Sequence, residues 1–457
     1  MSDARTQRTN QLGEGSIVRL YARLALPAVV AQIVNLLYNI VDRIYIGHIP
    51  DVGASALTGV GLFMPILMLI NAFAMLAAAG GAPLAAIAMG SRDNERAEKI
   101  LGGCFSLLLM FSVLLTVVFY ILAPILLRFF GASDVTLPYA LDYARIYILG
   151  SFFVLMVLGM NPFITTQGFA KISMLTTIIG AGLNIVLDPI FIFAFGMGVK
   201  GAAIATVLSQ AVGAAWILRF LTGEKTLLRI RRENLGLDMK IIKPCLALGV
   251  SSFVMMSTES LLSMSFTSSL ARYGGDIAVG AMTIINSVAQ LAVMPLQGLC
   301  QGGQPIISFN FGAGNRERVK RAFGLQLGVC LGYASSFTAL TIVFPRLFAG
   351  IFTPNAELLD FAAWALRIYM AGIWIFGAQI ACQQSFMALG QAKVSLFLAC
   401  LRKLILLIPM IFVLPFFFEN KVFAVFLAEP VSDIIAALVT TTVFLLRFDK
   451  ILDKSGK

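Results

Sequence analysis

The sequence has little charge for its length. Only 12% of its 457 residues are charged and 59% are hydrophobic, with a mean hydropathy of +0.90, whereas a soluble globular chain has about 25% charged residues. The apolar residues are spread along the whole chain, which excludes a soluble enzyme carrying a single membrane anchor. The composition therefore predicts a membrane protein.

Motifs that carry chemistry are also scarce. The chain has one histidine and six cysteines that stand singly, so neither a disulfide framework nor a zinc site is expected. It lacks GxxxxGK[ST], HExxH and GxSxG patterns, which argues against ATP hydrolysis and against an enzyme. The polar first 17 residues contain no apolar segment ending in a cleavage site, so no cleaved signal peptide is predicted.

The net charge of +11 has a simple explanation. The basic residues lie mainly in short loops between apolar runs, where the preference of cytoplasmic loops for Lys and Arg already accounts for them. We therefore expect no nucleic-acid partner. The same bias places both termini in the cytoplasm. We expect a multi-pass protein of the inner (plasma) membrane.

A membrane-spanning helix needs about 20 mostly apolar residues, and twelve stretches satisfy this. The first six are 24–46, 57–79, 100–122, 139–160, 172–195 and 202–221. The second six are 245–270, 277–301, 322–344, 361–389, 394–417 and 422–446. We predict an all-α membrane protein with a six-helix lobe over 1–222, a basic cytoplasmic linker over 223–243 and a second six-helix lobe over 244–457.

The two halves repeat one another. A shift of 222 residues places Gly80-Gly81-x-Pro83 on Gly302-Gly303-x-Pro305, Gly90 on Gly312, and Arg145-Ile146-Tyr147 on Arg367-Ile368-Tyr369. Because six spans separate equivalent points, both halves enter the membrane in the same sense. The repeat predicts two bundles related by a pseudo-twofold axis along the membrane normal, with a cleft between them.

A carboxylate at membrane depth costs about 2.5 kcal/mol or more on insertion scales, so each one calls for a partner or a purpose. In the first lobe, a rise of 1.5 Å per residue places Asp42, Asp188 and Thr206 about 9 to 10 Å below the outer surface, on three different helices. Asn184 shares a helix face with Asp188, and Tyr143 falls at a similar depth. These five residues form a candidate cation-coupling site.

Two carboxylates with amide and hydroxyl oxygens nearby suit Na⁺, which is held by oxygen ligands. Asp42, Asn184 and Asp188 would be its ligands. The same pair suits H⁺, because a bound proton relieves the repulsion between two carboxylates in an apolar site. A pair that only fastens two helices, or an Asp42 neutralised by Arg43, is the structural alternative.

Other polar residues in the spans could line a substrate cavity or join helices by hydrogen bonds. Asn35, Asn161 and Gln290 are candidates for the cavity, and Glu259 stands alone in the middle of its helix. Pro27 interrupts the hydrogen bonding of the first helix, which makes that helix a candidate for bending. Four further charges, at Arg402, Lys403, Glu429 and Asp433, are interpreted first as a network fastening the last two helices together.

Together these features resemble the multidrug and toxic compound extrusion (MATE) family, over nearly the whole chain. The resemblance rests on Leu26-Pro27, Val41-Asp42, Gly168-x-Ala170-Lys171, Asn184-x-x-x-Asp188-Pro189, Gly198-x-x-Gly201-Ala202-Ala203 and Gly302-Gly303-Gln304-Pro305. It implies Na⁺- or H⁺-driven export of amphipathic, often cationic compounds by alternating access. It also implies that Asp42, Asn184, Asp188 and Thr206 bind the coupling ion and that Glu259 matches a helix 7 glutamate used in some branches.

We therefore expect a bacterial-type multidrug antiporter that works as a monomer among membrane lipids, exports small amphipathic or cationic molecules and has no resident cofactor. A flippase for lipid-linked precursors, with a similar two-lobed build, is one alternative and would need a strongly basic cleft. A membrane scaffold or receptor without transport is another. In the second lobe, Met264 and Met410 occupy the positions equivalent to Asp42 and Asp188, so cation coupling is expected in the first lobe.

Overall fold

The computed structural model describes residues 12–453 and 455, and all the regular elements in this part of the chain are helices. Ten of these helices are long and apolar enough to cross a membrane, or eleven when the bent pair α5 (Leu137–Leu149) and α6 (Ser151–Thr166) is taken as one span. The chain is thus an all-α, multi-pass membrane protein, as the sequence predicted.

The first lobe contains the N-terminal spans. After α2 (Ile17–Gly47) come α3 (Gly53–Gly90), α4 (Asn94–Phe129), the α5–α6 pair, α7 (Ala170–Pro189), the π-helical turn η1 (Ile190–Ala194) and α8 (Gly198–Thr222). The single helix expected over 139–160 is wrong in one respect, because α5 and α6 bend by 56° at Gly150. A Cβ at Gly150 would lie 2.4 Å from Val207, so the glycine lets α8 pack against the bend.

The second lobe follows a short 3₁₀ turn, η2 (Arg232–Asn234). Its elements are α9 (Met239–Gly312), α10 (Arg316–Val343), α11 (Pro345–Gly350), α12 (Ala356–Tyr369), η3 (Met370–Gly372), α13 (Ile373–Ala388), α14 (Ala392–Cys400), η4 (Leu401–Leu407), α15 (Ile408–Val413), η5 (Leu414–Phe416) and α16 (Lys421–Leu452). The expected helix over 361–389 is built from α12, η3 and α13, and that over 394–417 from α14 to η5.

One element, α9, supplies two spans. Its 74 residues would extend about 110 Å at 1.5 Å per residue, far more than the roughly 30 Å of a bilayer core. The helix is interrupted at Gly275, whose φ of 64° and ψ of −160° leave the helical region, a conformation that glycine adopts without strain. With α9 counted as two, the spans agree with the twelve expected.

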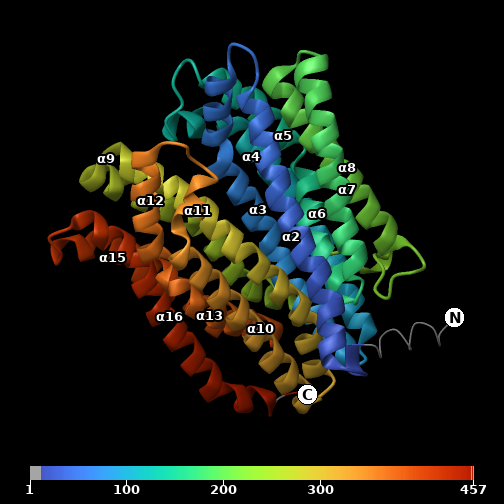
Figure 1. Cartoon of the computed structure of the whole chain (residues 1–457). Coiled ribbons are helices and arrows are strands. Elements are labelled where there is room, and N and C mark those ends of the chain that lie inside the picture. Colours follow the sequence, from blue (N-terminus) through green and yellow to red (C-terminus); the bar gives the residue numbers. More distant parts are fainter. Residues whose placement is uncertain (1–11, 454, 456–457) are drawn as a thin grey trace.

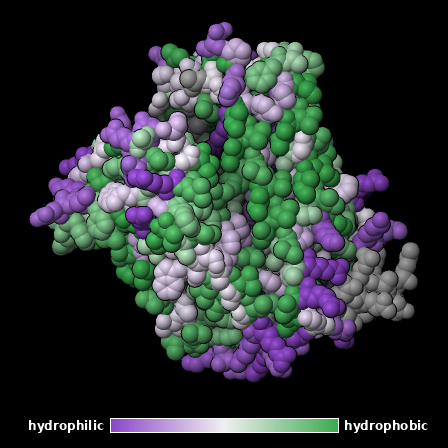
Figure 2. All heavy atoms as spheres, viewed as in Figure 1, coloured by the Kyte–Doolittle hydropathy of each residue, from purple (hydrophilic) through white to green (hydrophobic). Residues whose placement is uncertain are grey.

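The two lobes meet along α9, which packs against both α2 and α3. In Figure 1 the first lobe lies on the right and the second on the left, with the start of α2 and the end of α16 toward the lower end. Figure 2 shows hydrophilic residues gathered at that end and a broad apolar surface above it. This distribution is the one expected of a protein whose middle is surrounded by lipid.

Glycines bring the lobes into close contact at the end that holds the termini. A Cβ on Gly90 of α3 would lie 2.0 Å from the carbonyl oxygen of Phe309, and a Cβ on Gly312 of α9 would lie 2.0 Å from that of Ile87. These two contacts are related by the 222-residue repeat, so they are equivalent across the pseudo-twofold axis. Nearby, the Asn310 amide donates to the Leu12 carbonyl oxygen at 3.0 Å, which fastens the start of the described chain to the second lobe.

Candidate ion and substrate sites

The carboxylates of the first lobe meet where α2 packs along α7 and α7 along α8. The amide nitrogen of Asn184 donates to Asp188 Oδ1 and to Thr206 Oγ1, both at 3.3 Å. The side chains of Asp42 and Asp188 lie within hydrogen-bonding reach of each other. The structure thus brings together residues from three helices that the depth argument placed at one level.

The site is buried and rich in oxygen atoms that lack partners. Asn184, Asp188 and Thr206 are 1%, 0% and 4% exposed. Asp42 Oδ1, Asn184 Oδ1 and Asp188 Oδ2 are buried without a hydrogen-bond partner among the described residues. Buried oxygens are usually paired, and oxygen atoms of this kind are the ligands that a hard cation uses.

Arg43 does not neutralise Asp42 through an ion pair in the described part of the chain. Its guanidinium is exposed and reaches toward the sulfur of Met64 on α3, 4.0 Å away. Consecutive helical residues point about 100° apart, which separates Arg43 from the face that carries Asp42. Arg43 therefore lies in electrostatic range of Asp42 without forming an ion pair with it among the described residues.

Three tyrosines, Tyr38, Tyr143 and Tyr147, lie near the carboxylates. Tyr143 lies within hydrogen-bonding reach of Thr206 and stacks on Tyr147 with ring centroids 6.0 Å apart. Tyr38 lies in electrostatic range of both Asp42 and Asp188. Sequence reasoning found Tyr143 but missed Tyr38 and Tyr147; their i, i+4 spacing from Asp42 and Tyr143 could have identified them.

The outer end of α7 is shaped by its own sequence. Pro189 follows Asp188 directly and removes a backbone donor, and the next five residues form the π-helical turn η1. Single π-turns inside α-helices occur frequently at functional sites. The change of register after Asp188 ends the regular α-helix immediately beyond the carboxylate pair.

The second-lobe charges form two groups. Arg402 in η4 pairs with Glu429 Oε1 at 2.9 Å and with Asp433 Oδ1 at 2.7 Å, which is the predicted link between the last two spans. Lys403 instead points to α9, where it pairs with Glu259. The expectation that Glu259 stands alone is therefore wrong, because a partner 144 residues away reaches it.

The remaining cavity candidates differ in their surroundings. Gln290 on α9 is exposed and Asn35 on α2 is half-buried. The Asn161 amide donates to the Ser173 carbonyl oxygen at 3.3 Å and so joins α6 to α7, although its Oδ1 is buried without a partner. Among the described residues, no hydrogen bond joins Asn35, Asn161 or Gln290 to one another or to Glu259.

Pro27 lies inside α2, which is assigned as one helix through it. Two glycines of α9 let the proline segment approach closely: a Cβ at Gly298 would lie 2.7 Å from the Val29 Cα, and one at Gly302 would lie 2.3 Å from the Ala25 Cα. Any bend of α2 at Pro27 would therefore move the contact between the lobes.

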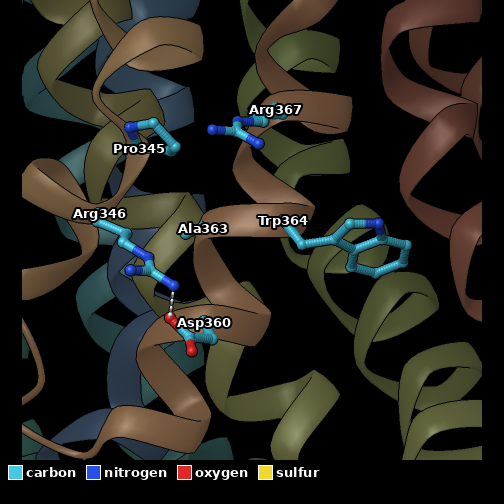
Figure 3. Close-up of a pocket in the computed structure, with 6 residues that line it drawn as sticks. All are labelled: Pro345, Arg346, Asp360, Ala363, Trp364 and Arg367. Carbon is cyan, nitrogen blue, oxygen red and sulfur yellow. Dashed lines mark ion pairs between the residues drawn. The ribbon is translucent and has the colours of Figure 1, made fainter.

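A separate surface depression lies at α11 and α12 (Figure 3). It is lined by Pro345, Arg346, Asp360, Ala363, Trp364 and Arg367, and Arg346 pairs with Asp360 at 2.9 Å. Both members of this pair are more exposed than buried. None of the predicted site residues lines this depression.

The fold defines a class: a polytopic membrane protein built from two related lobes. The chain belongs to the MatE family, whose model matches residues 27–190 and 251–413. These two segments correspond to the two halves of the internal repeat. The resemblance drawn from the sequence motifs is thereby confirmed, and the class is one of transporters.

Known proteins similar to the chain agree with this assignment. The multidrug export protein MepA of Staphylococcus aureus (strain NCTC 8325 / PS 47) is 23% identical over 449 residues, covering 96% of each chain. A multidrug resistance MATE family transporter of the MOP superfamily in an outward-facing conformation superposes with a TM-score of 0.91, at 26% identity over 97% of this chain and 98% of that one. A crystal structure of MATE in the bent conformation also gives 0.91, at 25% identity over 98% and 99%.

Proposed function

We propose that the protein is a secondary antiporter that exports amphipathic, often cationic organic compounds in exchange for Na⁺ or H⁺. Membership of the MatE family and the similarity to a multidrug export protein support export of small molecules. The observation that carries the coupling is the set of three unpartnered oxygens on Asp42, Asn184 and Asp188.

The chemistry of this set suits a monovalent cation. Two carboxylate side chains offer negative charge, while the Asn184 and Thr206 side chains offer neutral oxygens, which together are ligands that a hard ion prefers. A proton can serve in the same place, because one carboxyl in its acid form can donate a hydrogen bond to the other. The Asp42 and Asp188 side chains lie within reach for that bond.

Coupling requires that the cation and the substrate favour different states of the protein. Asp42 is carried by α2, which also packs on α9 of the other lobe. Occupation of the carboxylate pair would change how α2 sits on α7, and Pro27 provides a place for α2 to bend. Movement at the Pro27 segment would then open or close the glycine contacts between the lobes.

In this proposal the structure represents one state of the cycle. The close glycine contacts between the lobes lie at the end that holds the start of α2 and the end of α16, and an outward-facing transporter is among the similar structures. With both termini in the cytoplasm of a plasma-membrane protein, the closed end faces inward. In this proposal the protein works as a monomer, with the surrounding lipids covering its exposed apolar helices.

The flippase alternative receives no support from the charges at membrane depth. Arg402 and Lys403 are both paired with carboxylates, so neither offers a free positive charge to a pyrophosphate group. A basic cleft is what that function would need.

Reconstituted vesicles test the proposal. Export of a fluorescent organic cation is measured after imposing a Na⁺ gradient and, separately, a pH gradient. We expect one of the two gradients to drive accumulation by wild type, and Asp42→Asn to abolish it. Failure of both gradients to move any organic cation would refute the antiporter assignment. Equal driven transport by Asp42→Asn would refute the location of the coupling site.

A further inference from the structure

Lys403 and Glu259 form an ion pair at membrane depth, and the two side chains differ in exposure. The Lys403 side chain is 8% exposed, whereas that of Glu259 is 50% exposed. The buried ammonium also donates to the Met255 carbonyl oxygen at 2.8 Å, one turn before Glu259 on α9. The carboxylate is thus reachable from outside the helix bundle, and the lysine that neutralises it is not.

The local backbone separates Lys403 from the neighbouring cation. Arg402 and Lys403 are adjacent in the π-helical segment η4, yet Arg402 turns to Glu429 and Asp433 of α16 and covers the ring of Phe376 at 4.3 Å. The Arg402 charge is therefore taken up within the bundle. Lys403 is left with Glu259 as its ion-pair partner in the described chain.

A polar stripe continues from Glu259 along its exposed side, with the apolar Leu261 and Met264 exposed beside it. Ser263 and Thr267 follow at i+4 and i+8 on the same face of α9, and both are exposed. A membrane protein rarely presents a polar stripe headed by a carboxylate to lipid, because such groups are costly there. Ser260, the residue after Glu259, contacts the sulfur of Met68 on α3 of the first lobe at 3.5 Å. This part of α9 therefore lies beside the other lobe, and we take its exposed face, from Glu259 toward the break at Gly275, as the one open to water.

We propose that Lys403 is a resident counter-ion that occupies Glu259 when no substrate is bound and so sets the affinity of this face for organic cations. A cationic compound entering along the polar stripe has to displace the ammonium before it can pair with Glu259. Such competition lowers affinity for simple monovalent cations and makes Lys403 a specificity-determining residue. The inference rests on the proposed export of organic cations.

The prediction follows from the charge balance. Glu259 and Lys403 together are neutral, so a cation that enters beside the intact pair meets no net charge from these two residues. Arg402, Glu429 and Asp433 lie in electrostatic range of the pair, and their charges are the same in every variant compared. In Lys403→Met most of the aliphatic stem is kept, the ammonium is lost and the half-exposed Glu259 carboxylate loses its ion-pair partner. We expect such a site to bind a monovalent organic cation about tenfold more tightly, as is typical of one charged interaction gained.

Titration calorimetry of purified full-length protein with tetraphenylphosphonium provides the test. Lys403→Met is expected to bind it about tenfold more tightly than wild type, Lys403→Arg to match wild type, and Lys403→Met with Glu259→Gln to lose the gain. The exposed Lys421→Met, in the same lobe, serves as a matched control and is expected to behave as wild type. Lys403→Gln, which can still donate to the Met255 carbonyl oxygen, repeats the test should Lys403→Met fold poorly.

Each outcome separates the inference from the proposed function. If wild type binds tetraphenylphosphonium and neither Lys403→Met nor Lys403→Gln binds it more tightly, the inference is overturned and the export proposal stands. A gain that survives Glu259→Gln would overturn it as well. Absence of organic-cation binding in wild type and in every variant would refute the proposed substrate class, and the inference with it.

Discussion

Asp42 of α2 and Asp188 of α7 face each other across the contact between their helices, and each carries a buried side-chain oxygen without a hydrogen-bond partner in the described structure. Two carboxylates in this position repel one another unless a cation or a proton is shared between them. The pair therefore links the occupancy of a small site to the fit of α2 against α7.

Asp188→Asn removes one of the two charges and is expected to reduce gradient-driven export at least a hundredfold, because the remaining carboxylate no longer needs a cation to offset repulsion. The protein should still fold, since the amide has nearly the same shape. Transport by reconstituted vesicles is the measurement. Asp142→Asn is the matched control: Asp142 is 41% exposed and pairs with Lys200 at 3.5 Å, and its loss should leave export nearly unchanged.

Thr206→Val keeps the side-chain shape and removes the hydroxyl that accepts from Asn184. We expect the concentration of coupling cation needed for half-maximal transport to rise about tenfold, because a neutral oxygen ligand is lost, while the maximal rate changes little. Thr222→Val on the same helix removes a hydroxyl that donates only to the Leu218 carbonyl oxygen, 2.8 Å away and one turn earlier. An equal effect of the two substitutions would contradict a specific role for Thr206.

The Arg402 network should matter for stability more than for ion coupling. Arg402→Met leaves Glu429 and Asp433 buried beside each other without their ion-pair partner, which typically costs about 3 kcal/mol or more. We expect a clear fall in Tm in detergent. Arg316→Met is the control, because its pair with Asp453 is mostly exposed and such pairs contribute little. A similar Tm for the two variants would show that the buried network does not stabilise the lobe.

The glycine contacts at the closed end predict a conformational effect. A Cβ at Gly90 or Gly312 would lie 2.0 Å from a carbonyl oxygen of the other lobe, so the double variant Gly90→Ala with Gly312→Ala forces the backbones apart. Spin labels at the exposed positions of Arg96 and Arg321 should report a longer inter-lobe distance. Gly324→Ala, with open space around its Cβ, should leave the distance distribution unchanged.

The sequence predicted those features that depend only on apolar length, helical rise per residue and the internal repeat. Apolar length identified the spans, and a fixed rise per residue converted positions 42, 188 and 206 into a common depth, which the contacts of Asn184 match. The 222-residue repeat likewise located Gly90 and Gly312, whose reciprocal contacts now relate the lobes.

Other features depend on side-chain directions that sequence spacing does not define. The pairing of Lys403 with Glu259 was missed because adjacent helical residues point about 100° apart, and only the packed structure shows that Arg402 meets α16 while Lys403 meets α9. The bend at Gly150 was missed because it depends on Val207 of α8, a neighbour that only the packed structure brings close.

The most direct test of the first-lobe site is to count the cations released when substrate binds to purified protein. Calorimetry in buffers of different ionisation enthalpy reports H⁺, and displacement of radioactive Na⁺ reports Na⁺. Wild type and the control Asp51→Asn, on an exposed turn where asparagine tolerates the φ of 64°, should release about one cation per substrate bound. Asp42→Asn should release none; the same release from Asp42→Asn as from wild type would contradict the assignment of the coupling site.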